Sequence, residues 1–359
     1  MTPLAGAAKE IKMRKLCLGF AVTIAISVSV GFAAQAPAGS YKVLKTAKVG
    51  GDGGFDYISA DVEARRLYVP RSGPMGHLAV FNLDTFQPVG DIPEIHSGGA
   101  IVDPKSHHGF STTKPVTMWD ADSLKVIKTI DVDGRPDGIL FDPYNERVWI
   151  LSHVAPHVTV IDGKDGAVVG TIDLGGAPEQ GVSDGEGTVY VNVSDMANIA
   201  VVDAKSLMVT AHYDISSKGS FLTGLALDTK NHILFSYAHQ PSSLAVVVNA
   251  TNGKIINAIP TGDGIDTVAF NPNTMEAIST DGMSGTMTFI KENSPTDFVV
   301  EQTLPTMRGA RTMVLDTKTN HIATQTGEFG PPPPPPPGGG RGGRAPMLPG
   351  SFTLLLVGK

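Results

Sequence analysis

Short apolar runs separated by turn-forming residues follow one another along most of this chain and predict β-strands. In Gly134–Leu151, "GRPDGILFDPYNERVWIL", the runs "ILF" and "VWIL" flank the turn "DPYNE". Looser copies of this stretch recur every 39 to 45 residues. In each copy an anchor residue, Asp or Asn, stands where the first run ends: Asp61, Asp103, Asp142, Asp184, Asp228, Asn271 and Asp316. Copies at this period predict a propeller or a solenoid.

The runs inside each copy distinguish these two architectures. After the anchor come a second run such as "RRLYV" or "GTVYV", a third such as "HLAVF" or "NIAVV", and a last one such as "LKVIKTI". Four short strands per repeat, with Gly, Pro, Asn and Asp between them, are typical of propeller blades. No stretch of the repeats has the periodicity of a helix over helical length. We therefore expect an all-β fold, a seven-bladed β-propeller with four-stranded antiparallel blades.

The two ends of the repeat region predict how the ring closes. Lys42–Val49, "KVLKTAKV", matches Lys125–Val132, "KVIKTIDV", whose position is that of the outermost strand of a blade. The final residues, "GSFTLLLVGK", match the third strand of a blade. The N-terminal strand is therefore expected to complete the last blade, which removes the free edge that an open ring would leave.

Residues 1–36 have the features of a secretory signal peptide. Four basic residues between Lys9 and Lys15 precede an uncharged run, Leu16–Ala34, and Ala34-Gln35-Ala36 fits a cleavage signal. We expect cleavage at or near this tripeptide and a periplasmic or secreted protein; an uncleaved membrane anchor is the alternative. Residues 37–359 then form a single propeller domain without cysteine, because Cys17 lies in the signal.

Composition and charge narrow the classes of partner. The chain has 41 Gly and 26 Pro among 359 residues, which suits a turn-rich β protein. Its net charge of −7 becomes −10 when the four basic residues and Glu10 of the signal are removed. This charge argues against nucleic acid as a partner, because phosphates bind basic surfaces. We expect a monomer with no membrane span after signal cleavage.

One segment interrupts the last repeat. Residues 327–349 contain seven consecutive prolines followed by a Gly-rich stretch with Arg341 and Arg344. Consecutive prolines favour a stiff polyproline II rod. A strand follows, so this segment is a long loop inserted in the last blade. It is either a tolerated surface insertion or a flap or docking arm for a partner.

Several stretches resemble a known family. "GGFDYISADVEARRLYVPR", "VTVIDGKDGAVVGTIDLGGAPEQGV" and "IAVVDAKSL" resemble the bacterial YVTN-repeat (YncE-like) seven-bladed propellers, over Tyr41–Lys359. The resemblance implies the fold and the class of repeat. It implies no particular site, because propellers carry unrelated chemistries. The proline-rich loop and the irregular sixth repeat, "MTFIKENSPTDFVVEQTL", depart from the family's pattern.

The alignment of the repeats predicts which side chains surround the mouth of the central channel. Five residues before each anchor stand Asp56, Gly98, Asp137, Glu179, Thr223, Asp266 and Arg311. The loops between the second and third strands open on the same face and contribute Arg71, His77, His153, His157, Asp195 and His239. The charged members of the first row, with Arg71 and the four histidines, are the candidate ligand-binding residues.

Two interpretations of the acidic positions are open. Each side chain caps N–H groups of its own loop, or the carboxylates converge on a cation or polar ligand while Arg311 meets an anionic group. Converging carboxylates repel one another, so some of their pKa values are expected to rise. A divalent cation held by His and carboxylate groups is an alternative, but no metal ligand or cofactor is assigned. The pair in "SHVAPH" lacks the helix and cysteines of a zinc motif.

Known catalytic motifs are absent from the sequence. It has no G-x-S-x-G elbow, no complete EF-hand loop and no C-x-x-C-H haem site. We therefore expect a non-catalytic binding scaffold whose channel-mouth face takes a small molecule, a glycan or a protein. The alternative is a metal-dependent enzyme on the same face, a lactonase-like hydrolase or a lyase.

Overall fold

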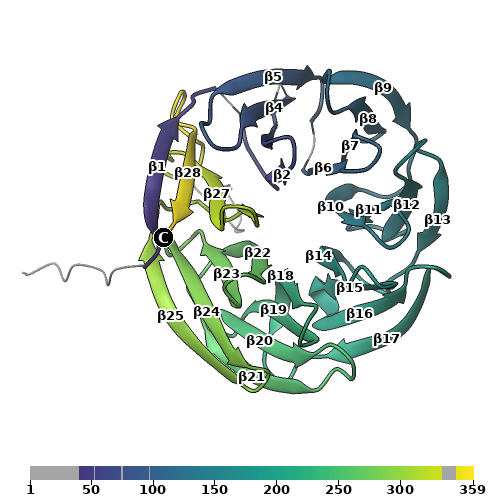
Figure 1. The fold of residues 1–359 in the computed structure, drawn as a ribbon, viewed down its shortest axis with the longest axis vertical. Coiled ribbons are helices and arrows are strands. Elements are labelled where there is room, and N and C mark those ends of the chain that lie inside the picture. Colours follow the sequence, from purple (N-terminus) through teal and green to yellow (C-terminus); the bar gives the residue numbers. More distant parts are fainter. Residues whose placement is uncertain (1–39, 52, 74–75, 97, 334–344) are drawn as a thin grey trace, which may run out of the picture. The chain divides into compact units, whose positions relative to one another are not determined.

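The computed structural model describes residues 40–51, 53–73, 76–96, 98–333 and 345–359, and the predicted signal peptide lies outside them. The described residues form seven four-stranded antiparallel sheets around a central opening (Figure 1). This confirms the predicted seven-bladed propeller. Apart from one turn of 3-10 helix, η1 (Ser194–Met196), the regular structure in this part of the chain is all strand. None of its helices is long and apolar enough to cross a membrane.

Each blade is one sheet, and in the first six blades the strands run in sequence order from the channel to the rim. The first three blades are β2 (Ser59–Asp61), β3 (Arg66–Arg71), β4 (His77–Asn82), β5 (Pro88–Pro93); β6 (Ala100–Asp103), β7 (His108–Ser111), β8 (Val116–Asp120), β9 (Lys125–Ile130); and β10 (Pro136–Asp142), β11 (Arg147–Ser152), β12 (Val158–Asp162), β13 (Val168–Ile172). Blades 4 to 6 are β14 (Pro178–Ser183), β15 (Thr188–Val193), β16 (Asn198–Asp203), β17 (Met208–Asp214); β18 (Ser220–Asp228), β19 (Ile233–Gln240), β20 (Leu244–Asn249), β21 (Ile255–Pro260); and β22 (Ile265–Asn271), β23 (Glu276–Asp281), β24 (Thr286–Ser294), β25 (Asp297–Pro305).

The seventh blade joins both ends of the ring, as predicted. It consists of β26 (Met313–Asp316), β27 (His321–Thr326), β28 (Thr353–Gly358) and, outermost, β1 (Lys42–Lys48), which pairs antiparallel with β28 (Figure 1). Tyr41 stacks on Phe289 of blade 6 and donates its hydroxyl to the buried Glu276. Lys359 Nζ lies 3.0 Å from the same carboxylate. One residue of blade 6 therefore holds both ends of the propeller.

The repeated anchor residues have a common structural role at the turn between the first two strands. Each side-chain oxygen accepts a hydrogen bond from an N–H two or three residues further on, as Asp142 does from Tyr144 and Asp316 from Lys318. The same contact occurs at the other five anchors. The recurring Asp or Asn is thus an Asx turn, the local bond that short polar side chains favour.

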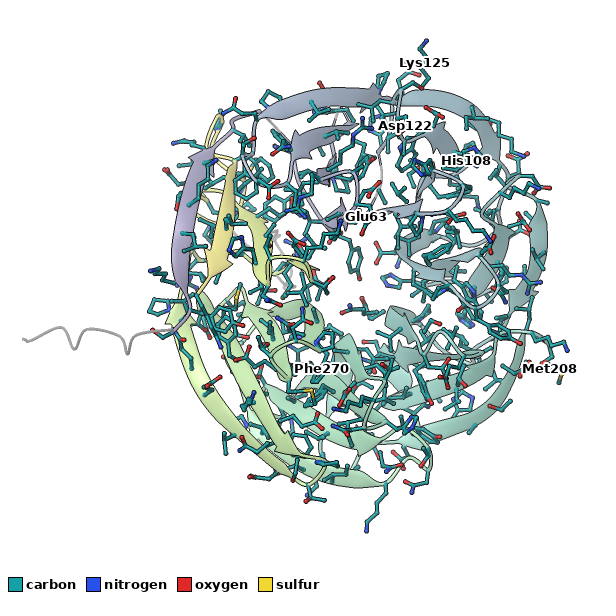
Figure 2. The ribbon with its side chains drawn as sticks, viewed as in Figure 1. Glu63, His108, Asp122, Lys125, Met208 and Phe270 are labelled. Carbon is teal, nitrogen blue, oxygen red and sulfur yellow. The ribbon has the colours of Figure 1, made fainter. Side chains whose placement is uncertain are left out.

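In the described part of the chain, the apolar core is divided among seven clusters, one at each junction between neighbouring blades. Figure 2 shows Phe270 of β22 between blades 5 and 6, where its ring stacks on Phe235 at 5.6 Å. The same view shows Lys125 on β9 and Met208 on β17 at the rim, where their side chains reach solvent. Burial of the apolar side chains between blades stabilises the ring, while the outermost strands expose both polar and apolar side chains.

Candidate functional site

The innermost strands bring four acidic side chains to the mouth of the channel. Asp56 precedes β2, Asp137 lies on β10, Glu179 on β14 and Asp266 on β22. Burial and then the charges of these four carboxylates raise the pKa of Tyr57 well above its ordinary value. All four carboxylates therefore act on one phenol, although they come from four different blades.

Arg311 pairs with two of these four carboxylates and so separates them from the other two. Its Nε lies 2.7 Å from Asp266 Oδ2, and its NH2 group lies 3.2 Å from Asp56 Oδ1 and donates to the Phe55 carbonyl at 3.0 Å. Arg311 is largely buried, so these contacts replace the water that its guanidinium loses. The two charges hold its pKa above the ordinary value despite burial.

Burial and mutual repulsion raise the pKa values of two of the acids. Burial, followed by the charge of Asp266, raises the pKa of Asp56 to about 7, although Arg311 acts in the opposite direction. Burial also raises the pKa of Asp137, and the charge of Glu179 adds to this effect while His153 opposes it. The rise predicted for converging carboxylates is thus present at these two positions.

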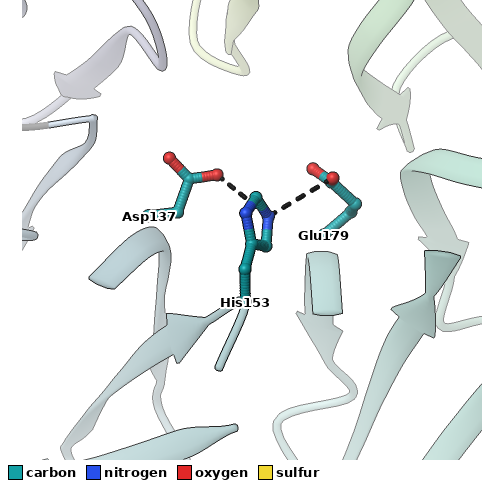
Figure 3. A group of neighbouring side chains, drawn as sticks. All are labelled: Asp137, His153 and Glu179. Carbon is teal, nitrogen blue, oxygen red and sulfur yellow. Dashed lines mark ion pairs between the residues drawn. The ribbon is translucent and has the colours of Figure 1, made fainter. Parts of the chain in front are cut away.

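The other two carboxylates meet a histidine (Figure 3). His153 follows β11, and its Nε2 lies 3.2 Å from Asp137 Oδ2 and 3.3 Å from Glu179 Oε1. Among the described residues, this buried nitrogen is aligned with neither oxygen for a hydrogen bond, so the contacts are electrostatic. The contact with Glu179 and the charge of Asp137 raise the pKa of His153. On the other side of the imidazole ring, the NH2 group of Arg135 lies 2.9 Å from His153 Nδ1.

Sequence reasoning missed Tyr57, which donates its hydroxyl to Glu179 Oε2 at 3.1 Å. Four residues before each anchor, the other blades carry small or polar residues without rings: Gly99, Gly138, Gln180, Gly224, Thr267 and Thr312. The only aromatic side chain in this row was a signal that the alignment contained. Gln180 fills part of the same level, where its Oε1 accepts hydrogen bonds from Leu225 N and Val268 N.

A cavity of about 1130 Å³ opens on the mouth face above blades 5 to 7. Its charged lining residues are Glu179, Asp266, Arg308, Arg311 and Glu328. Phe221, Met283 and Phe329 form an apolar rim, with 56 %, 67 % and 40 % of their surfaces exposed. Such exposure of large apolar side chains at a cavity marks a surface that a ligand can cover.

The stem of the proline-rich loop contributes part of this rim. The loop joins β27 to β28, and Phe329 pairs with Met347 in an isolated bridge. Gly330 N donates to the Pro346 carbonyl at 2.9 Å, which keeps the two sides of the stem together. Residues 334–344, which include Arg341 and Arg344, lie outside the described residues.

The remaining sequence candidates do not join the carboxylate ring. Arg71 is buried where blades 7 and 1 meet, with its guanidinium 3.6 Å from the centre of the Phe352 ring. His77 lies 3.6 Å from Asp91, and both line a separate cavity of about 430 Å³.

Two further histidines and Asp195 are held by local contacts. His157 Nδ1 lies 2.6 Å from the exposed Asp173, away from His153 in the same loop. Asp195 accepts the N–H of Ala177 at 2.9 Å, as a loop-capping acid does. His239 is closer to the site, because its Nε2 lies 2.9 Å from the hydroxyl of Thr223, which lines the large cavity.

Comparisons with solved structures agree on the fold. A chain of "Crystal Structure of Mitotic Checkpoint Complex" matches with a TM-score of 0.69 and 11 % identity, over 88 % of this chain and 96 % of that chain. A chain of "Crystal structure of RRP9 WD40 repeats" matches at 0.68 and 12 %, over 88 % and 97 %. A chain of "Kuenenia stuttgartiensis Hydrazine Synthase" matches at 0.67 and 13 %, over 76 % and 92 %. At such identities the likeness shows the propeller fold alone. No protein-family model and no curated protein sequence matches the chain.

Proposed function

We propose that this protein is a secreted or periplasmic propeller of the YVTN-repeat class that binds a small molecule at its channel mouth. The cavity of about 1130 Å³ is the observation that carries this proposal. Its size is close to that of small-molecule pockets, which range over roughly 300–1,000 Å³. A cavity of this size favours a small molecule over a flat protein surface.

The lining of the cavity supports a ligand with an apolar body and a cationic end. Phe221, Met283 and Phe329 offer apolar contact at the rim. The charged groups of the lining are three carboxylates, of Glu179, Asp266 and Glu328, and two guanidinium groups, of Arg308 and Arg311. Arg311 is already paired with two carboxylates. The lining therefore carries a small excess of negative charge, which favours a cation over an anion.

Three probes that share one apolar body and differ in the head group test this proposal. We expect the EDTA-treated protein without its signal to bind 2-phenylethylammonium more tightly than 2-phenylethanol, and 3-phenylpropionate least, by titration calorimetry. Met283→Ala should weaken the binding of the ammonium and the alcohol by similar factors, because it removes rim contact. Asp266→Asn should weaken only the ammonium, because it removes one negative charge.

Met208→Ala is the matched control. Met208 is 64 % exposed, close to the 67 % of Met283, but it lies on β17 at the outer edge of its blade. Its removal should leave every affinity unchanged. Equal loss in the two methionine variants, or no binding of any probe at millimolar concentration, would overturn the proposal.

Export of the protein is tested separately, by measuring the mass of the recovered chain. A chain expressed with residues 1–36 should be recovered outside the cytoplasm with a new N-terminus at or near Ala34–Pro37. Recovery of the intact chain in the membrane fraction would show an uncleaved anchor instead.

A metal-dependent hydrolase or lyase is the second candidate, and one observation favours it. Asp137, His153 and Glu179 bring three side chains of metal-ligating type together. Hydrolysis of a lactone panel by the zinc- or manganese-loaded protein, lost in His153→Gln, would support this candidate over a binding scaffold.

A further inference from the structure

We infer that Asp137, His153 and Glu179 form a site for one divalent transition-metal ion, Zn²⁺ or Mn²⁺. The inference goes beyond binding of an organic ligand in the large cavity and does not depend on it. The three residues come from two neighbouring blades, so the site exists only where blades 3 and 4 pack together (Figure 3).

The distances between the donor atoms fit an ion. An ion with bonds of about 2.1 Å holds adjacent ligand atoms roughly 3.0–3.4 Å apart. His153 Nε2 lies 3.2 Å from Asp137 Oδ2 and 3.3 Å from Glu179 Oε1. One donor atom from each of the three residues lies within 4.8 Å of the others. Only small side-chain movements are needed to bring the two carboxylates onto one ion.

The surroundings leave room for Asp137 and orient Glu179. At the equivalent position of blade 2 stands Gly98, where an added Cβ would lie 2.8 Å from Asp137 Oδ1. Tyr57 donates to Glu179 Oε2 and leaves Oε1 toward His153. Such an outer hydrogen bond fixes a ligating carboxylate and is common around metal sites.

The kind of donor selects the class of ion. One imidazole nitrogen with two carboxylate oxygens suits Zn²⁺ or Mn²⁺. Ca²⁺ and Mg²⁺ prefer sites made of oxygen alone. The side chains of Asp137, His153 and Glu179 are 26 %, 23 % and 20 % exposed, so an ion held by them keeps positions open to solvent or to a ligand.

Arg135 opposes metal binding in a way that can be measured. Its guanidinium lies 2.9 Å from His153 Nδ1 and can only donate, so neutral His153 carries its proton on Nε2. A metal ion at Nε2 requires that proton to move to Nδ1 and Arg135 to turn away. Arg135 is exposed, so it is free to do so, at some cost in affinity.

The test is calorimetric titration of the full EDTA-treated protein, without its signal, with Zn²⁺ alone and then with Mn²⁺ alone. We expect one ion per chain. Asp137→Asn, His153→Gln and Glu179→Gln should each weaken binding by about tenfold or more, since loss of an outer-shell partner alone costs roughly 10–100-fold. Arg135→Gln should tighten it severalfold.

Two matched variants exclude general effects of charge and loop change. His157→Gln changes a histidine that lies in the same loop as His153 but pairs with Asp173. Asp195→Asn removes an acid of the neighbouring blade that caps the N–H of Ala177. Both should bind the ion within about twofold of the wild type. Equal affinities of His153→Gln and His157→Gln, weaker binding by Arg135→Gln, or no bound ion in the wild type would each overturn the inference.

A measurement on the unaltered protein covers the case in which a variant fails to fold. Addition of Zn²⁺ should shift the imidazole NMR signals of one histidine in preference to the others. A uniform small shift of all histidines would refute a defined site. No organic probe is present in the metal experiments. If Zn²⁺ and Mn²⁺ do not bind, the results of the probe series in the large cavity therefore still stand by themselves.

Discussion

Glu292→Gln should stabilise the protein much more at alkaline pH than at acidic pH. Glu292 lies near the end of β24 that is away from the channel mouth, and it is only 3 % exposed. Its Oε1 accepts a hydrogen bond from Asn231 at 2.7 Å. Among the described residues, Glu292 Oε2 and Asp228 Oδ2 have no hydrogen-bond partner. Burial raises the pKa of Glu292 to about 7, and the charge of Asp228 adds to this while Asn231 opposes it.

The size and sign of the effect follow from this pKa. A rise from 4.5 to about 7 corresponds to about 3 kcal/mol, at 1.36 kcal/mol per unit. The folded protein holds this proton more tightly than the unfolded chain does. The contribution of Glu292 to the free energy of unfolding is therefore most favourable below pH 4.5 and falls as the pH rises toward 7. Above pH 7 the folded protein bears the full free-energy cost of the buried charge. Glutamine has no charge to bury, and its amide can donate to Asp228.

Urea unfolding of both proteins at pH 5 and pH 8 measures the difference. The variant should gain about 3 kcal/mol at pH 8 and less than about 1 kcal/mol at pH 5. Glu63→Gln is the control, because Glu63 is 75 % exposed and pairs with Lys318 only at the surface, where ion pairs contribute little. Equal gains of Glu292→Gln at the two pH values, or a loss at pH 8, would refute the assignment.

Three further variants test the packing, the closure and the channel mouth. Gly109→Ala should lower the free energy of unfolding by about 1–3 kcal/mol in urea titrations, because the new Cβ would lie 2.0 Å from the Trp119 side chain; an unchanged midpoint would contradict this packing. Tyr41→Phe should cost about 2 kcal/mol in the same assay, because the buried Glu276 loses a hydrogen bond; a neutral result would show that the bond does not hold the ring closed. Arg311→Met should raise the pKa of Asp56 further, since the charge of Arg311 now opposes protonation of this carboxyl; carboxyl NMR titration that showed a fall would contradict the pairing.

Most of the fold could be predicted from the repeat, because the sequence signals of the repeat are local. The anchor residues recur because each closes its own Asx turn, as Asp142 does with Tyr144. Strand order follows from the short turns between consecutive runs, and closure follows from the match of Lys42–Val49 to an outermost strand. None of these signals requires knowledge of a distant contact, so all of them could be found along the chain.

The sequence narrowed the candidate residues of the site, but it could not show which of them contact one another. The position five residues before each anchor identified the acids that surround Tyr57. It did not show that Asp56 and Asp266 pair with Arg311 while Asp137 and Glu179 face His153. Equivalent positions in a repeat have equal status along the sequence, whereas their partners depend on the side chains that neighbouring blades present.

The histidines show the same limit within one loop. His153 and His157 are four residues apart, yet one turns to the channel and the other to Asp173 at the outer edge of its blade. By itself, the sequence determined the seven blades, their turns, the closing strand and the ring position that carries the acids. Only the tertiary structure decided which charges meet and where a cavity opens, because these depend on contacts between blades that are distant along the chain.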